Sequence, residues 1–145
     1  MPWNFPEPLG RQTVIELPFS ETVLIARHIR TSHLHNYINQ AALQDIRNAA
    51  TPPPTAADAT GRSAQIFTVE VTAVNGDKMR RVRVRGRDIY AFTAPLVCEA
   101  VERIVAGRVQ GGGAFAPGEL FDAWAFLAAL VERDELDLEA TGSAN

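Results

Sequence analysis

Residues 64–87 read AQIFTVEVTAVNGDKMRRVRVRGR, and this stretch decides the fold. Apolar and polar residues alternate on both sides of Asn75-Gly76, a preferred pair for a two-residue hairpin turn. With that turn, Val74 faces Asp77, and the numbers of paired residues sum to about 151. Apolar pairs then share one face and polar pairs share the other. We therefore expect a long antiparallel hairpin over about 64–87.

The segments before the hairpin predict short elements and one long loop. They are a strand over 13–17, a helix over 21–29 capped by Ser20, a β-like stretch over 32–38 and a short helix over 41–47. Residues 49–63 include three consecutive prolines, which can continue neither a helix nor a central strand. We expect a long surface loop there.

Two helices are predicted after the hairpin. The first spans Thr93–Ala106, with Thr93 as its N-cap, Pro95 in its first turn and Gly107 at its end. The residues that recur in it at helical spacing are Val97, Ala100, Val101, Ile104 and Val105, and Glu99 and Arg103 form an i,i+4 pair. The second helix starts at Pro117 and is capped again at Asp122.

These elements predict an α+β fold, with an antiparallel or mixed sheet that contains the hairpin and is covered by helices on one face. We expect an irregular lead over 1–12 and a single domain over 13–131. Residues 132–145 are acidic and then small and polar, which predicts a frayed tail.

Composition excludes several classes of protein. The chain has 145 residues, 46% of them hydrophobic, so wholesale disorder is excluded and one domain is expected. No apolar run approaches about 18 residues, and the N-terminus has no signal-peptide pattern, so no membrane partner is expected. The single cysteine, Cys98, excludes a disulfide framework and favours the cytoplasm. The excess of Arg over Lys and the many Ala residues favour a bacterial source.

Two possible ligand motifs are weak. Residues 111–116 read GGGAFA and match a dinucleotide fingerprint by letters, but a predicted helix precedes them where a strand is required. We therefore expect a turn between helices and no cofactor bound by this chain alone. His28, His33 and His35 lack further ligands at metal-binding spacing, so no metal is expected and surface histidines are favoured.

The hairpin ends in a stripe of five arginines, namely Arg80, Arg81, Arg83, Arg85 and Arg87. One interpretation is a solvated sheet face or a subunit contact. The other is an anion clamp, because Arg can hold a carboxylate or phosphate in a bidentate fork. The net charge of −3 and the lack of interleaved aromatic residues argue against nucleic acid.

The strand-to-helix junction after the hairpin is the candidate site. Arg87, Tyr90 and Thr93 are the candidate substrate-binding residues, because they place a cation, a phenol and a helix N-terminus together. A small anionic substrate would suit them. The alternative is that Thr93 only caps the helix and Tyr90 only packs. Cys98 is expected in the core or in an interface, and no catalytic residue can be named.

Three separated strings carry a resemblance to a known family. They are LPFSETVLIARH at 17–28, GRDIYAFTAP at 86–95 and GGAFAPG at 112–118. In this order they resemble the second half of saccharopine dehydrogenase-like oxidoreductases, over about residues 13–131. The resemblance implies an α+β domain that follows a Rossmann domain in a complete family member and shapes the substrate pocket and the subunit contact.

The Rossmann pattern of that family is missing from this sequence. The resemblance therefore implies the substrate-side and dimerisation domain alone, with NAD(P) bound by the Rossmann domain of a complete family member. Three origins stay open for such a lone domain, namely a truncated product, a fragment, or the partner of a separate Rossmann-domain chain. We expect a homo-oligomer, most simply a dimer built through the sheet or its adjoining helices. The alternative is a non-catalytic module for small-molecule binding or oligomerisation. Whether the chain is itself an enzyme, and on which substrate, stays open.

Overall fold

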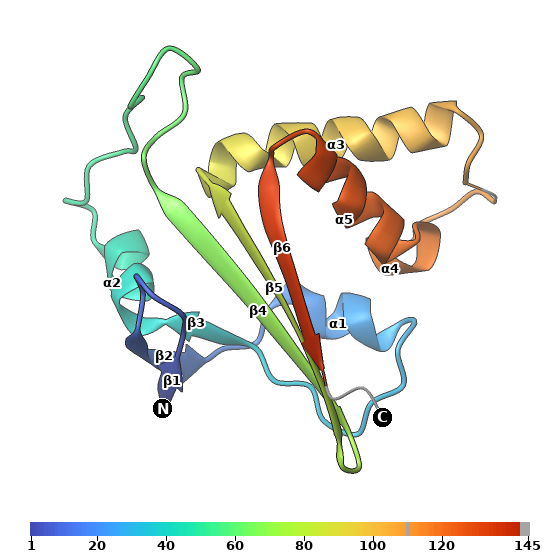
Figure 1. Ribbon diagram of the computed structural model, residues 1–145, viewed down its shortest axis with the longest axis horizontal. Coiled ribbons are helices and arrows are strands. Elements are labelled where there is room, and N and C mark those ends of the chain that lie inside the picture. Colours follow the sequence, from blue (N-terminus) through green and yellow to red (C-terminus); the bar gives the residue numbers. More distant parts are fainter. Residues whose placement is uncertain (110, 143–145) are drawn as a thin grey trace. The chain divides into compact units, whose positions relative to one another are not determined.

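The computed structural model describes residues 1–109 and 111–142 and has an α+β fold with antiparallel sheets. The chain divides into two compact units (Figure 1). Unit 1 contains residues 1–53 and 114–119, and unit 2 contains residues 54–113 and the chain from Leu120 onward. The sequence predicts one domain over 13–131, but a boundary falls between Pro53 and Pro54. The proline run explains this position, because it cannot continue a helix or strand across it.

Unit 1 is built on a small antiparallel sheet with the strand order β1-β2-β3. Its strands are β1 (Pro2–Asn4), β2 (Arg11–Glu16) and β3 (Tyr37–Asn39), and its helices are α1 (Ser20–Ala26) and α2 (Gln40–Arg47). The predicted irregular lead over 1–12 is therefore wrong, because β1 pairs with the start of β2. The short helix after residue 40 is confirmed. It starts where the Asn39 side chain accepts a hydrogen bond from the Ala41 amide at 2.8 Å.

Unit 2 holds the predicted hairpin and a third strand, in the order β4-β5-β6. The strands are β4 (Ile66–Asn75), β5 (Lys78–Arg87) and β6 (Leu136–Gly142). The helices are α3 (Ile89–Val105) and α5 (Ala123–Glu132), while the short α4 (Pro117–Leu120) begins in unit 1. Helices α3 and α5 lie at the end of this sheet where β4 begins and β5 ends (Figure 1). The capping of α5 by Asp122 is confirmed, since its carboxylate accepts from the Ala125 amide at 2.7 Å.

The hairpin is confirmed, but its register differs from the prediction by two. Asn75 pairs with Lys78 and Val71 with Val82, so the turn is Gly76-Asp77. Gly76 takes a φ of 58°, and a glycine in the first central position is the preference of a type II′ turn. A shift of two keeps every side chain on its predicted face, because side chains in a strand alternate with a period of two.

The two faces of this sheet differ in chemistry, as the hairpin pattern predicts. One face carries Phe67, Val84 and Leu138, which pack around a buried cluster of Phe92, Leu130 and Leu136 supplied by α3, α5 and β6. The opposite face carries charged side chains from all three strands. Helices therefore cover one face of the sheet, as expected.

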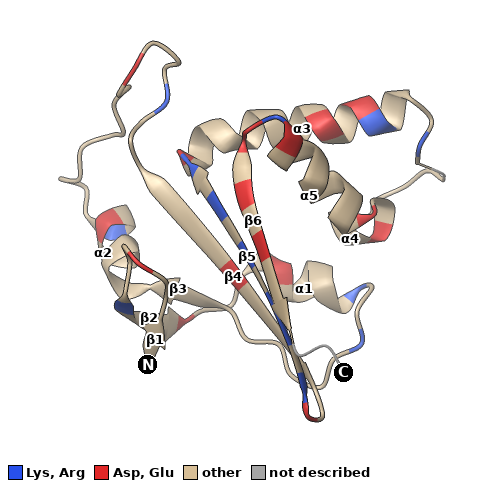
Figure 2. Cartoon of the chain, in the orientation of Figure 1, with Lys and Arg blue, Asp and Glu red and all other residues tan. Residues whose placement is uncertain are grey.

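The predicted frayed tail is wrong over Leu136–Gly142, which forms β6 along the far edge of β5. Two of the acidic residues that suggest a solvated tail, Asp137 and Glu139, are cross-strand partners of the arginine stripe. Glu139 lies opposite Arg83, and the two side chains form an ion pair of 2.6 Å. Figure 2 shows the acidic positions of β6 beside the basic positions of β5.

Candidate functional site

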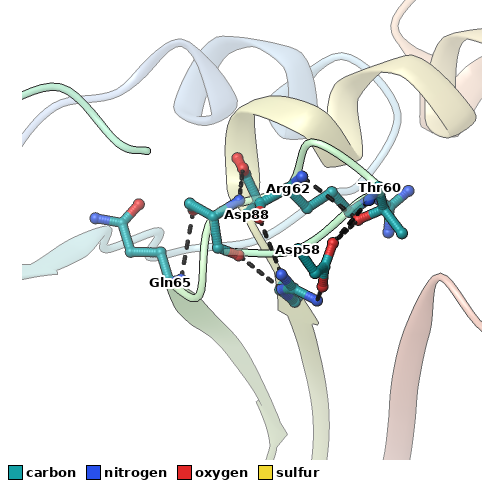
Figure 3. Close-up of polar contacts among 7 residues, drawn as sticks. Asp58, Thr60, Arg62, Gln65 and Asp88 are labelled. Atoms are coloured by element: carbon teal, nitrogen blue, oxygen red, sulfur yellow. Dashed lines mark hydrogen bonds and ion pairs between the residues drawn. The ribbon is translucent and has the colours of Figure 1, made fainter. Parts of the chain in front are cut away.

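The junction between β5 and α3 is organised around Asp88, which is buried and adopts a left-handed conformation with φ of 55°. One carboxylate oxygen of Asp88 accepts from the Ala91 amide at 3.0 Å, and the other accepts from the Ser63 amide at 2.8 Å. These backbone donors hold the pKa of Asp88 below its usual range, with Ala91 the larger cause. Asp88 thus caps the helix and fixes the end of the loop that precedes β4 (Figure 3).

Helix α3 therefore begins four residues earlier than predicted, and Thr93 is not its N-cap. The Thr93 hydroxyl instead donates to the carbonyl oxygen of Ile89 at 3.3 Å, within the first turns of the helix. Pro95 likewise lies inside the helix and not in its first turn. The physical reason is that Asp88 accepts a hydrogen bond from a free amide of the first turn, which Thr93 cannot reach from inside the helix.

Arg87 is held by the loop of residues 58–63, which lies in the predicted Pro-rich segment. Its guanidinium donates to the Ser63 carbonyl at 2.6 Å, to the Asp58 carboxylate at 2.6 Å and to the Arg62 carbonyl at 2.9 Å. All three nitrogens of the guanidinium therefore have partners within the chain. An anionic substrate at Arg87 stays a prediction, and it would have to compete with Asp58.

Asp58 is the anion that holds Arg87 in place. Its carboxylate accepts from the Thr60 hydroxyl at 2.5 Å and from the Thr60 amide at 2.9 Å, beside the ion pair with Arg87 (Figure 3). The Thr60 hydroxyl, followed by Arg87, lowers the pKa of Asp58 from its ordinary 3.8 to about 2. We call the contacts among Asp58, Thr60, Ser63, Arg87 and Asp88 the loop latch.

Gly86, the first residue of the Gly86-Arg87-Asp88 string, also has a structural role. It lies directly opposite Phe67 on β4, and a Cβ at position 86 would lie 2.5 Å from the tip of the Phe67 ring. That ring is fixed by Phe92, whose ring centroid is 5.3 Å away. All three residues of the string thus support the fold at the same junction.

Tyr90, the second residue of α3, is 68% exposed. It begins a line of exposed apolar residues along α3, which we call the α3 stripe. The stripe consists of Tyr90, Ala94, Val97, Cys98, Val101, Ile104 and Val105. The opposite side of α3 faces the core with Phe92 and Glu99. Cys98 is therefore not a core residue, and its placement in an interface stays a prediction.

Two arginines of the arginine stripe, Arg81 and Arg83, form ion pairs within the sheet. Glu70 is 2% exposed at its side chain and binds Arg83 at 2.8 Å, while Arg83 also binds Glu139. Glu70, followed by Glu139 among the charged partners, raises the pKa of Arg83. Glu70 lies opposite Arg83 and not opposite Arg81 as predicted, although the Arg81 Nε is 3.5 Å from the same carboxylate. These pairs occupy Arg83 and approach Arg81, while the choice between a solvated sheet face or subunit contact and an anion clamp stays a prediction.

A second charged cluster links α3 to α5 and encloses a hollow of about 220 Å³. Glu99 is 3% exposed and binds both Arg103, at 2.5 Å, and Arg133, at 2.8 Å. The Glu99–Arg103 pair confirms the predicted i,i+4 contact. Arg103 also donates to the Ala125 carbonyl at 2.8 Å, which ties the two helices together. The pairing with Glu102 raises the pKa of Arg133. Arg108 and Glu132 also line this hollow.

In unit 1 the first and third strings of the resemblance meet. Arg27 donates to the Glu119 carboxylate at 3.0 Å and to the Ala114 carbonyl at 3.0 Å. The His28 ring lies so close to Gly118 that a Cβ there would overlap it. The Ala116 amide, which donates to Glu119 at 2.6 Å, is the main cause that lowers the pKa of Glu119. These strings therefore also make packing contacts.

The remaining candidates are the histidines, the glycine-rich stretch over 111–116 and the helices as membrane spans. The rings of His33 and His35 are parallel with centroids 6.3 Å apart, and both residues are exposed. Across the described ranges, no three or more His, Cys, Asp or Glu side chains are grouped to hold a metal ion. The stretch 111–116 lies between α3 and α4, which confirms a connection between helices. Within the part of the chain that the structure describes, no helix is both long enough and apolar enough to cross a membrane.

The sequence misses two features of this region. The loop latch depends on Ser63, which binds Asp88 from 25 residues away, and on Asp58, which binds Arg87 from 29 residues away, and no local pattern links these residues. A local signal was present in the Asp58-Ala59-Thr60 string, since Asp commonly accepts from a residue two positions on. The orientation of the α3 stripe needs the position of the core, which spacing alone does not supply.

No protein-family model, curated protein or solved structure matches this chain.

Proposed function

We propose that this chain is the dimerisation and substrate-side domain of a saccharopine dehydrogenase-like oxidoreductase, and that its main contribution is assembly. The α3 stripe is the observation that carries the proposal. It is a continuous line of exposed apolar residues on a well-formed helix. Patches of this kind are uncommon on monomers and usually mark a contact with another protein.

Assembly is better supported than substrate binding at the predicted site. The Arg87 guanidinium donates hydrogen bonds to the loop of residues 58–63 in the same chain, and Asp88 caps α3. Thr93 bonds within its helix, so only Tyr90 among the predicted contacts offers an unengaged polar group in the described ranges. A single exposed phenol supports a protein contact at least as well as a ligand contact.

NAD(P) belongs, in this proposal, to a separate cofactor-binding domain. A dinucleotide needs a strand, a glycine-rich turn and a helix in a parallel βαβ unit. In the described residues the strand pairs are antiparallel and the glycine-rich stretch follows a helix, which supports the assignment of the cofactor to another domain. We place the chain in the cytoplasm, where a single unpaired Cys98 is ordinary.

A second candidate function, binding of a small charged molecule, rests on the hollow between α3 and α5. Its wall carries both signs of charge, and Arg108 there takes part in no ion pair that the described residues make. A thermal-shift screen of small carboxylates, repeated with Arg108→Ala, tests this candidate. A stabilisation that Arg108→Ala removes would support it, and no stabilisation by any compound would contradict it.

Sedimentation equilibrium of the full chain tests the main proposal. We expect the mass to rise with concentration toward twice the chain mass of 15.8 kDa. A parallel titration with NADPH should show no saturable binding. A monomeric mass at every concentration would overturn the role in assembly, and micromolar NADPH binding would overturn the assignment of the cofactor to another domain.

A further inference from the structure

The spacing of the α3 stripe is that of a helix-to-helix contact. Tyr90, Ala94, Val97, Val101 and Ile104 follow one another by four, three, four and three residues, which is the spacing of the inner positions of a coiled coil. Cys98 and Val105 stand directly beside this line. A sheet edge or a flat protein surface would not require such a narrow helical seam, so the spacing favours a helix as the partner.

We propose that the α3 stripe binds the same stripe of a second copy of this chain, with the two helices antiparallel. This inference rests on the proposed role in assembly and names the surface and the partner. An antiparallel pair is related by a two-fold axis, so one contact surface serves both copies and the assembly closes as a dimer.

The chemistry of the stripe suits a second copy. No residue of the stripe is charged, so two copies meet without like-charge repulsion. Antiparallel helices also place the positive end of one helix dipole beside the negative end of the other. In a parallel pair, by contrast, the like ends of the two dipoles would meet.

Side-chain sizes also match in the antiparallel arrangement. With the two-fold axis near Val97 and Cys98, the small Ala94 of one copy faces Val101 of the other. Tyr90 of one copy then faces the aliphatic residues near Ile104 at the C-terminal end of α3 in the other copy. Each bulky residue thus meets a residue it can pack against, and the two tyrosines lie at opposite ends of the contact.

The exposed area is close to what a dimer of this kind needs. The five larger residues of the stripe are between 49% and 81% exposed. If a fully exposed large side chain presents about 150–250 Å², the stripe and its flanks offer roughly 600 Å² per copy. A standard interface buries about 800 Å² per partner, so the α3 stripe supplies most of such a contact.

Cys98 gives this arrangement a direct readout. It is exposed, it lies at the middle of the stripe, and it is the only cysteine of the sequence. In an antiparallel helix pair centred there, the two Cys98 side chains lie on the same side of the seam and near the axis. A short bismaleimide linker can therefore join them only if the copies pair in this way.

The test combines that cross-link with two matched substitutions in the full chain. Val101→Glu places a carboxylate in the stripe, and Val71→Glu makes the same change on the sheet. The two valines are similarly exposed, at 50% and 59%. We expect Val101→Glu to raise the dimer dissociation constant by about 100-fold or more, because each dimer carries the buried carboxylate twice. Val71→Glu should leave it unchanged.

Cross-linking of the wild type should give one covalent dimer, which Cys98→Ser abolishes and Val101→Glu strongly reduces. Circular dichroism and urea unfolding confirm that each variant folds, and Val97→Arg replaces Val101→Glu if the latter does not. The inference is overturned if the wild type dimerises without a Cys98 cross-link, or if Val101→Glu leaves the dimer intact. It is also overturned if Val71→Glu dissociates the dimer, which would place the contact on the sheet. Each of these results overturns the α3 contact and leaves the proposed role in assembly intact. A strictly monomeric wild type would overturn the α3 contact and the role in assembly together.

Discussion

The last residues of the loop latch, Arg87 and Asp88, lie directly before the α3 stripe in the chain, yet the two regions differ in which side chains are free to bind a partner. At Arg87 and Asp88 the charged groups have partners within the chain, at distances of 2.6–3.0 Å. From Tyr90 onward the outer side of α3 is apolar and exposed. The string that looks most like a binding motif is therefore occupied with holding its own loop. The neighbouring α3 stripe, of which only Tyr90 and Ala94 belong to that string, has no partner in the described chain.

We expect substitutions in the loop latch and in the α3 stripe to have opposite effects on the stability of the chain and on its mass in solution. Changes in the loop latch should lower the stability of the chain and leave its mass alone, whereas changes in the α3 stripe should do the reverse. The latch side of that contrast can be tested at Asp58, Arg87 and Asp88, and the neighbouring Gly86 tests the packing beside it.

Asp88→Ala should have the largest effect. It removes both hydrogen bonds that the buried carboxylate accepts, and it places Ala at a φ of 55°, which alanine adopts poorly. We expect the Tm to fall by about 5–10 °C. Asp88→Asn keeps an acceptor for Ala91 and tolerates the same φ, so it should lose roughly half as much. Equal Tm values for wild type and Asp88→Ala by calorimetry would show that the cap is dispensable.

Gly86→Ala should be the next most damaging change, because its Cβ would lie 2.5 Å from the Phe67 ring. The ring cannot move freely since it packs on Phe92 in the core. We expect a loss of about 1–3 kcal/mol in the free energy of unfolding, measured by urea denaturation.

Gly112→Ala is the matched control for Gly86→Ala. A Cβ at position 112 would have no neighbour within 4 Å, and the backbone there does not need a glycine conformation. Its stability should stay within about 0.5 kcal/mol of the wild type. If the two alanine variants are equally stable, the close approach of Phe67 to Gly86 does not constrain this strand.

Arg87→Ala should release the loop of residues 58–63 more than it unfolds the chain. The Arg87 side chain is 33% exposed, so solvent compensates for part of the lost contacts. We expect a Tm decrease of about 2–4 °C, together with faster cleavage of the loop in limited proteolysis. Arg85→Ala, an exposed arginine on the same strand, should change neither. Unchanged cleavage of Arg87→Ala would mean that other contacts hold the loop.

The hairpin shows how far the sequence alone can lead. Alternation over 64–87 correctly predicts two paired strands and the chemistry of each face. It cannot separate a turn at Asn75-Gly76 from one at Gly76-Asp77, because a register shift of two leaves every face unchanged. The third strand escapes prediction because its acidic residues suggest solvent, until Arg83 is known to lie opposite Glu139.

The candidate site shows a second limit. The period of α3 correctly predicts a helix, but it does not say which side is buried. Phe92 and Glu99 face the core, so the valines at 97 and 101 are left outside. Likewise, Arg87 is a cation at a helix start by sequence, and only the fold brings Asp58 to it from a distant loop. Contacts between residues far apart in the chain decide whether a charged group is free.

The smallest effect should come from titrating Asp58, and it isolates one contact of the loop latch. In the folded chain the pKa of Asp58 is about 2, below its ordinary 3.8, because Thr60 and Arg87 bind the ionised form. A lowered folded pKa means that the contribution of Asp58 to stability is complete above about pH 4 and is lost as the pH falls toward 2. The Nε–H resonance of Arg87 should therefore keep its position down to about pH 4 and shift below it. Asp58→Asn provides the reference, since its amide does not titrate and Asp88 still does. The difference between the two titrations should be centred near pH 2, and superimposable curves would show that Asp58 does not hold Arg87 in solution.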